Sequence, residues 1–101
     1  VMHNTPEIRM PCSDDIKFEV VRRALAHYRR DHKVVDVDGA RVSFPGGWGL
    51  VRASNTGPVL VLRCEADSPA RLAEIRANLE GRLQTITAEL QPTAGFPSKA
   101  L

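Results

Sequence analysis

The chain has 101 residues, which is enough for one domain with a modest hydrophobic core. Its 43% hydrophobic and 26% charged residues are ordinary for a globular protein. The formal net charge of +2 is too small to indicate binding to nucleic acid or to an anionic membrane, because acidic and basic residues are interleaved. No apolar run approaches the roughly 20 residues that span a bilayer, and the first residues lack the pattern of a signal peptide. We therefore expect a cytoplasmic protein with neither nucleic acid nor membrane among its partners.

The first third of the chain is predicted to form a strand and then a helix. Residues 7–10 alternate polar and apolar side chains, and Pro11 is predicted to end this strand. Ser13 is predicted to cap the helix, since two aspartates follow it where the helix dipole favours negative charge. The basic residues 29–33 suit the helix C-terminus. The predicted inward face consists of side chains three and four residues apart, namely Phe18, Val21, Leu25 and Tyr28.

The middle of the chain is predicted to be antiparallel strands joined by turns. The pair Asp38-Gly39 is a strong tight-turn signal between β-branched segments, and residues 45–47 break the chain again. A polar, turn-prone loop covers residues 52–58. The run that follows is the most apolar in the chain and is predicted to be a central strand. The predicted strands cover residues 34–37, 42–44, 48–51 and 59–64.

A second helix is predicted near the C-terminus. Ser68 is placed to cap it, and Pro69 occupies the first position, where its missing N–H costs nothing. Gly81 lies inside this helix and weakens it by about 1 kcal/mol relative to alanine. We interpret its apolar stripe as core that packs on the sheet, rather than as a partner-binding seam. The stripe consists of Leu72, Ile75, Leu79, Leu83, Ile86 and Leu90.

These elements predict one α+β domain over residues 1–101, with an ordered core at about residues 5–90. The sheet is expected to be mainly antiparallel, with four to five strands and both helices packed on one face. The ends, residues 1–4 and 91–101, are predicted to be tails, the second of them frayed.

The reactive side chains of the sequence are not expected to form a catalytic or metal site. A bridge between Cys12 and Cys64 is allowed on paper, but a cytoplasmic protein keeps its thiols reduced, and we predict two free cysteines. His27 and His32 are five residues apart and do not share a helix face, and His3 is remote in sequence. We therefore predict no catalytic residue and no metal ligand in this chain.

The loop at residues 52–58 carries the clearest chemistry. Its arginine offers a planar fork that matches two oxygens of a phosphate, and its hydroxyl and amide side chains add donors. Its glycine lets the backbone approach an anion and can take a positive φ. The same residue types also favour a plain hairpin turn, so composition alone leaves both interpretations open. The candidate anion ligands are Arg52, Ser54, Asn55, Thr56 and Gly57.

Residues 48–60, which read WGLVRASNTGPVL, resemble the phosphate-binding loop of the α-D-phosphohexomutases. The form Arg-x-Ser-Asn-Thr is similar to the phosphomannomutase/phosphoglucomutase branch of that family. Gly57 departs from the pattern, which usually has threonine or glutamate at this position. The resemblance covers roughly residues 5–90, because the order and spacing of the family's last domain also fit residues 5–8, 13–18, 38–42 and 63–66.

The resemblance implies a TATA-box-binding-protein-like domain that closes over a phosphosugar. The substrates would be glucose or mannose 1- or 6-phosphate and the 1,6-bisphosphate, which the parent enzyme interconverts through a phosphoserine. Carried over residue by residue, Arg52, Ser54, Asn55 and Thr56 become ligands of the non-reacting phosphate, beside Gly57. The family's catalytic serine motif, magnesium loop and sugar-reading segment do not occur in this sequence. The isolated chain is therefore expected to be inactive and to contain no cofactor, with magnesium bound by another domain of the parent enzyme, which usually serves polysaccharide synthesis.

Two other functions remain open at this point. A sheet backed by two helices is a shape that RNA-binding proteins use, although only Phe44 and Trp48 are available on the strands for base stacking. A non-catalytic protein-docking module is the second alternative, and the polar loop would then be incidental.

Overall fold

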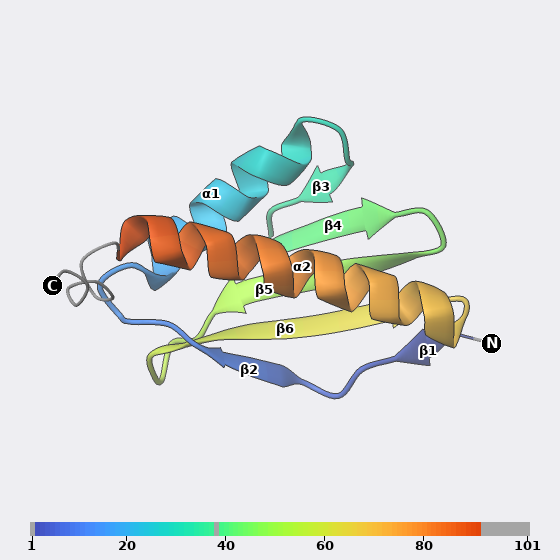
Figure 1. The fold of residues 1–101 in the computed structure, drawn as a ribbon, viewed down its shortest axis with the longest axis horizontal. Coiled ribbons are helices and arrows are strands. Elements are labelled where there is room, and N and C mark those ends of the chain that lie inside the picture. Colours follow the sequence, from blue (N-terminus) through green and yellow to red (C-terminus); the bar gives the residue numbers. More distant parts are fainter. Residues whose placement is uncertain (1, 38, 92–101) are drawn as a thin grey trace, which may run out of the picture.

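The computed structural model describes residues 2–37 and 39–91, which form a sheet covered by two helices (Figure 1). The elements in chain order are β1 (His3–Asn4), β2 (Ile8–Pro11), α1 (Lys17–Arg29), β3 (Val34–Val35), β4 (Ala40–Phe44), β5 (Gly47–Ala53), β6 (Val59–Ala66) and α2 (Pro69–Leu90).

The six strands form one antiparallel sheet in the order β1-β6-β5-β4-β3, and β2 pairs with β6 on the same edge as β1. Strand β6 is central, as predicted, because β5 pairs along one side of it and β1 and β2 share the other. Both helices lie on the same face of the sheet (Figure 1). The predicted α+β fold is therefore confirmed, with six strands in the described part of the chain rather than four to five.

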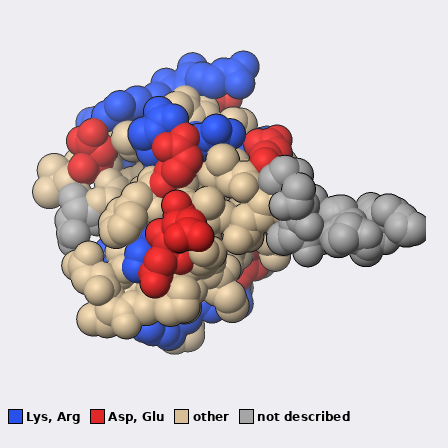
Figure 2. All heavy atoms as spheres, turned by 90° about the vertical axis from the view of Figure 1, so that its left-hand side faces the viewer, with Lys and Arg blue, Asp and Glu red and all other residues tan. Residues whose placement is uncertain are grey.

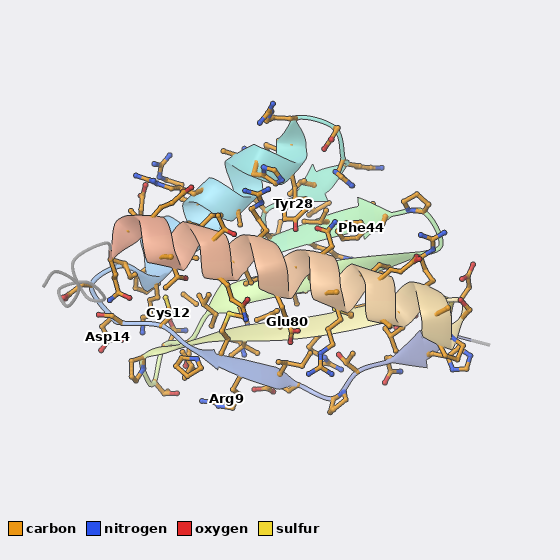
Figure 3. All side chains as sticks on the ribbon, viewed as in Figure 1. Arg9, Cys12, Asp14, Tyr28, Phe44 and Glu80 are labelled. Carbon is orange, nitrogen blue, oxygen red and sulfur yellow. The ribbon has the colours of Figure 1, made fainter. Side chains whose placement is uncertain are left out.

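The core lies between the sheet and the two helices. Strand β6 turns alternate side chains inward, and the predicted stripe of α2 packs on them through Ile75, Leu79, Leu83 and Ile86. Tyr28 of α1 is fully buried, and its hydroxyl donates to the Asn78 side chain of α2. Figure 3 shows Tyr28 and Phe44 between α1 and the sheet, where their rings meet edge to face with centroids 5.8 Å apart.

Two capping predictions had different outcomes. Ser68 caps α2 as predicted, because its Oγ accepts a hydrogen bond of 3.1 Å from the Arg71 backbone N–H, and Pro69 begins the helix. The prediction that Ser13 caps α1 is wrong. Ser13 Oγ accepts from the Asp15 N–H at 3.3 Å in a turn that precedes the helix, and α1 itself begins only at Lys17.

The inward face of α1 also differs from the prediction. The buried positions are Lys17, Val20, Ala24 and Tyr28, while Val21 and Leu25 are partly buried. Phe18 was predicted to be core but is 62% exposed. The face is shifted by one residue because a lysine, and not the neighbouring phenylalanine, occupies the inward position of the first turn.

Several strand boundaries differ from the sequence prediction. Residues 3–4, predicted as part of a tail, form β1, and Pro11 is the last residue of β2, on an edge where no N–H is needed. Strand β3 ends at Val35, so that Val37 is 76% exposed. Strand β5 extends to Ala53 and includes Arg52, which was predicted to lie in the loop.

The remaining predictions had mixed outcomes. The predicted two-residue turn at Asp38-Gly39 does not join the strands, because β3 ends at Val35, which pairs with Arg41, and β4 begins at Ala40. Gly39 has a positive φ of 114°, and Asp38 is outside the described residues. Residues 92–101 of the predicted C-terminal tail are also outside them. Cys12 and Cys64 are free and buried, as predicted. Neither helix of the described part combines the length and apolar character that a membrane span needs.

Two glycines provide a matched test of how α2 packs. A Cβ on Gly49 of β5 would collide with the Leu79 side chain of α2, whereas a Cβ on Gly81 would meet no heavy atom within 4 Å. We predict that Gly49→Ala lowers the free energy of unfolding by about 1–3 kcal/mol through overpacking. Gly81→Ala should raise it by about 0.5–1 kcal/mol, because alanine is the better helix former. Denaturant unfolding of both variants measures this, and similar effects of the two would contradict the packing.

Cys64 and Tyr28 are buried ionisable groups of the core, and we predict that they make the fold less stable in alkaline solution. Burial raises the pKa of Cys64 to about 11 and the pKa of Tyr28 to about 12. Because the folded state favours the neutral forms, their stabilisation is complete below pH ~9 and is lost as the pH rises towards ~12. The urea midpoint should therefore fall between pH ~8 and pH ~11, and Cys64→Ala should reduce the size of that fall. Parallel pH curves for the variant and the unmodified chain would contradict the assignment to Cys64.

Candidate anion-binding site

The candidate loop joins β5 to β6 at the end of the molecule where α1 begins, on the left in Figure 1. The last pair of the β5–β6 ladder is Ala53 with Leu60, and the Ser54 N–H continues it by donating to the Val59 carbonyl at 3.0 Å. The Cys12 N–H donates to the Pro58 carbonyl at 2.8 Å, which ties the loop to the end of β2. The loop is therefore fixed at both ends by backbone hydrogen bonds.

Ser54, one of the predicted ligands, stabilises the turn by hydrogen bonding within the loop. Ser54 is buried, with 4% of its surface exposed, and its Oγ accepts a hydrogen bond of 3.1 Å from the Thr56 backbone N–H. The two hydroxyl oxygens of Ser54 and Thr56 are 3.2 Å apart. Ser54 lines neither of the hollows described below. In this structure its direct contribution is to the shape of the turn.

A buried lysine lies beneath the loop, and the sequence analysis did not identify it. Lys17 Nζ donates to the Ser54 carbonyl at 2.6 Å and to the Gly57 carbonyl at 3.0 Å, and it forms an ion pair of 2.8 Å with Asp14. The Lys17 side chain is 7% exposed, whereas the Asp14 side chain is 68% exposed. Figure 3 shows Asp14 at the same end of the molecule as the loop. The sequence did contain a signal, because Lys17, Val20 and Ala24 are spaced as residues on one helix face are.

Two hollows lie beside the loop, and Asn55 lines both. The first, which we call the Arg52 pocket, has a volume of about 210 Å³ and is lined by Phe18, Val21, Gly39, Arg52, Ala53 and Asn55. The second, which we call the Thr56 pocket, has a volume of about 380 Å³ and is lined by Asp14, Lys17, Phe18, Asn55, Thr56 and Gly57. Of the predicted ligands, Arg52 lines the first pocket, Thr56 and Gly57 line the second, and Asn55 lines both, as does Phe18.

The electrostatics of the two pockets differ. The Arg52 side chain lines its pocket and has no hydrogen-bond or ion-pair partner within residues 2–37 and 39–91. In the Thr56 pocket the Asp14 carboxylate repels an anion, and Lys17 directs its three donors to the carboxylate and to two carbonyls. An anion is therefore better accommodated by the Arg52 pocket.

Glycines shape this end of the sheet in different ways. A Cβ on Gly39 would lie 2.8 Å from the Arg52 Cβ and 2.6 Å from the Val51 carbonyl oxygen, so a glycine at position 39 leaves the room that Arg52 occupies. Gly57 is in open space, with no heavy atom within 4 Å of a Cβ placed there. Positive φ angles occur at Gly39 and Gly46 but not at Gly57. The suggestion that Gly57 supplies a positive φ is therefore not supported.

The aromatic residues on the strands do not form a stacking surface. Phe44 packs against Tyr28 in the core, and the Arg41 guanidinium lies over the Trp48 ring at 4.2 Å from its centroid. Figure 2 views the molecule from the end where the loop lies and shows acidic and basic side chains mixed on the visible face. Neither feature is typical of a surface that binds RNA.

A larger hollow of about 480 Å³ lies between the end of α1 and α2. Burial, followed by the charges of Arg82 and Arg30, lowers the pKa of His27, and His32 Nδ1 lies 2.6 Å from the Asp31 carboxylate. Within residues 2–37 and 39–91, no three or more His, Cys, Asp or Glu side chains are grouped so that they could hold a metal ion.

Comparison with known proteins identifies the class to which this fold and loop belong. The sequence profile described as "Phosphoglucomutase/phosphomannomutase, C-terminal domain" matches residues 7–82. The chain therefore belongs to the phosphoglucomutase/phosphomannomutase family and corresponds to its C-terminal domain.

Individual relatives agree with this assignment. The chain is 44% identical over 89 residues to a phosphomannomutase/phosphoglucomutase of Pseudomonas syringae pv. tomato, with 86% of this chain and 19% of the relative covered. It is 45% identical over 93 residues to the protein of the same name from Pseudomonas putida, with 87% and 19% covered. A crystal structure of a phosphoglucomutase/phosphomannomutase family protein from Burkholderia thailandensis superposes with a TM-score of 0.69 at 36% identity, covering 85% of this chain and 18% of that one. The chain thus spans about a fifth of the length of these relatives.

Because the space around Gly57 is open, we expect the loop to accept a larger side chain at this position. We predict that Gly57→Thr changes the free energy of unfolding by less than about 0.5 kcal/mol, because the new side chain meets nothing. The matched variant Gly39→Thr should cost about 1–3 kcal/mol, since it needs a positive φ and collides with β5. Urea unfolding compares the two, and a loss of more than about 1 kcal/mol in Gly57→Thr would contradict the geometry of the loop.

Proposed function

We propose that this domain binds the phosphate group of a hexose phosphate within a phosphomannomutase/phosphoglucomutase. Its ligand would be the phosphate that does not react, on glucose or mannose 1- or 6-phosphate or on the 1,6-bisphosphate. The single observation that carries the proposal is Arg52, which projects from a paired strand into a pocket next to Asn55 and has no partner among the described residues.

The position of Arg52 suits a phosphate clamp. Its backbone is paired with Val61 in the β5–β6 ladder, so the strand limits the directions that the guanidinium can take. A guanidinium with open donors can form two parallel hydrogen bonds to one phosphate. Asn55 adds a side-chain amide from the adjacent turn. This grip recognises a phosphate rather than a particular sugar carbon, which suits a reaction in which the 1- and 6-phosphates exchange places.

The chemistry of the whole enzyme would come from other domains. The chain spans about a fifth of its relatives, so we assign the phosphoserine and a magnesium ion to parts of the parent protein outside this chain. The isolated chain would then bind a phosphosugar without converting it. We place the parent enzyme in the cytoplasm, where hexose phosphates are formed and consumed.

A substitution of Arg52 tests this proposal in a full-length mutase that carries the domain. We predict that Arg52→Ala lowers kcat/KM by about 10–100-fold, because charge-assisted hydrogen bonds to the phosphate are lost. Arg76→Ala removes the same charge from the exposed face of α2, where Arg76 pairs with Glu80, and should change kcat/KM less than about twofold. Steady-state kinetics with glucose 1-phosphate measures both variants. A change below twofold in Arg52→Ala would sink the assignment of Arg52.

A further inference from the structure

Lys17 holds the candidate loop by its carbonyl groups. Its ammonium donates to the first and the last carbonyl of the turn, those of Ser54 and Gly57, at 2.6 and 3.0 Å. These bonds join residues that are 37 and 40 positions apart in the chain. The lysine backbone belongs to the first turn of α1. The position of the loop is therefore fixed by a helix as well as by its own strands.

The bond to the Ser54 carbonyl also determines where the next N–H points. The described peptide bonds are trans, and in a trans peptide the C=O and N–H groups point in opposite directions. Because the Ser54 carbonyl points at Lys17, the Asn55 N–H points to the side of the loop away from Lys17. The Asn55 N–H has no acceptor among the described residues. The Asn55 N–H is therefore an oriented donor on a residue that itself lines the Arg52 pocket.

Asp14 occupies the remaining donor of Lys17. The ion pair of 2.8 Å completes three interactions for an ammonium that has three N–H groups. With all three donors directed into the protein, Lys17 is arranged to act on the loop rather than to bind a ligand itself. Its positive charge still lies behind the turn, where it opposes the repulsion between Asp14 and an incoming anion.

We propose that Lys17 is a positioning residue that fixes the Ser54–Asn55 peptide so that the Asn55 N–H donates to the phosphate held by Arg52. The proposal rests on the proposed function, because it assigns a further donor, and the residue that orients it, to the same site. A phosphate in this position would receive the guanidinium of Arg52 together with the backbone and side chain of Asn55.

The test is an amide-resolved NMR titration of the 101-residue chain with inorganic phosphate, comparing Lys17→Met with the unmodified chain. In the unmodified chain, phosphate should shift the Asn55 amide and the Arg52 side-chain Nε–H. In Lys17→Met, the Asn55 response should be lost while the Arg52 response remains, with an affinity about tenfold weaker, or about 1.4 kcal/mol. A purely structural role would weaken both responses together.

Two control variants separate the effect of position from the effect of charge. Lys33→Met removes the same charge from an exposed site after the other end of α1, and it should leave the affinity within about twofold. Asp15→Asn removes a negative charge next to Asp14 and leaves the three partners of Lys17 in place, so phosphate should bind as well as before or better. A tenfold loss in Lys33→Met would show that net charge alone sets the affinity and would overturn the proposal.

A measurement without ligand keeps the inference falsifiable if phosphate binding is weak. Backbone ¹⁵N relaxation should show order parameters of Asn55 and Thr56 that fall from ~0.85 to below ~0.6 in Lys17→Met, but not in Lys33→Met. Equal order in the unmodified chain and in Lys17→Met, or equal phosphate affinity of the two, would overturn the role of Lys17 alone. No response of Arg52 or Asn55 to phosphate in the unmodified chain would overturn the proposed function and this inference together.

Discussion

The hydrogen bonds from the buried Lys17 ammonium to two loop carbonyls link the helical layer of this domain to its candidate site. A buried charge is costly unless its donors are satisfied, and here two carbonyls and the Asp14 carboxylate satisfy them. The interaction requires α1 to begin close to the β5–β6 loop. That placement in turn depends on how both helices pack on the sheet, through Tyr28 with Asn78 and through the close approach of α2 at Gly49. The packing of the core therefore determines whether Lys17 can reach the loop carbonyls.

The sheet supplies the second constraint. Arg52 belongs to a strand paired along its full length with β6, and its neighbour Val51 is buried in the core. An arginine near the end of such a strand has a backbone held by the ladder, and no partner of its guanidinium is found within residues 2–37 and 39–91, an arrangement that suits anion recognition. The turn that follows contributes polar groups whose direction depends on bonds within the loop, notably that from the Thr56 N–H to Ser54 Oγ. The proposed phosphate clamp depends on this combination of a charged side chain on a paired strand and a turn held by hydrogen bonds within the loop.

Much of the fold could be predicted from the sequence, and most of the predictions that failed depend on contacts between residues distant in the chain. The α2 stripe and its Ser68 cap were correct because period and capping residues act within one helix. The prediction of the inward face of α1 was wrong because it placed a phenylalanine, and not a lysine, in the core. Hydrophobicity alone does not show that Lys17 donates to carbonyls 37 and 40 residues away. β1 was missed because two residues carry too little pattern. The loop residues were identified from their donor chemistry and from the resemblance to a family, but their distribution between two pockets depends on tertiary structure.

The most direct test of this account is a crystal structure of the chain with glucose 1-phosphate. We expect a phosphate within hydrogen-bond distance of the Arg52 guanidinium and the Asn55 N–H, with Lys17 still bound to the Ser54 and Gly57 carbonyls. A phosphate in the Thr56 pocket, in contact with Lys17 and with Asp14 displaced, would contradict this expectation.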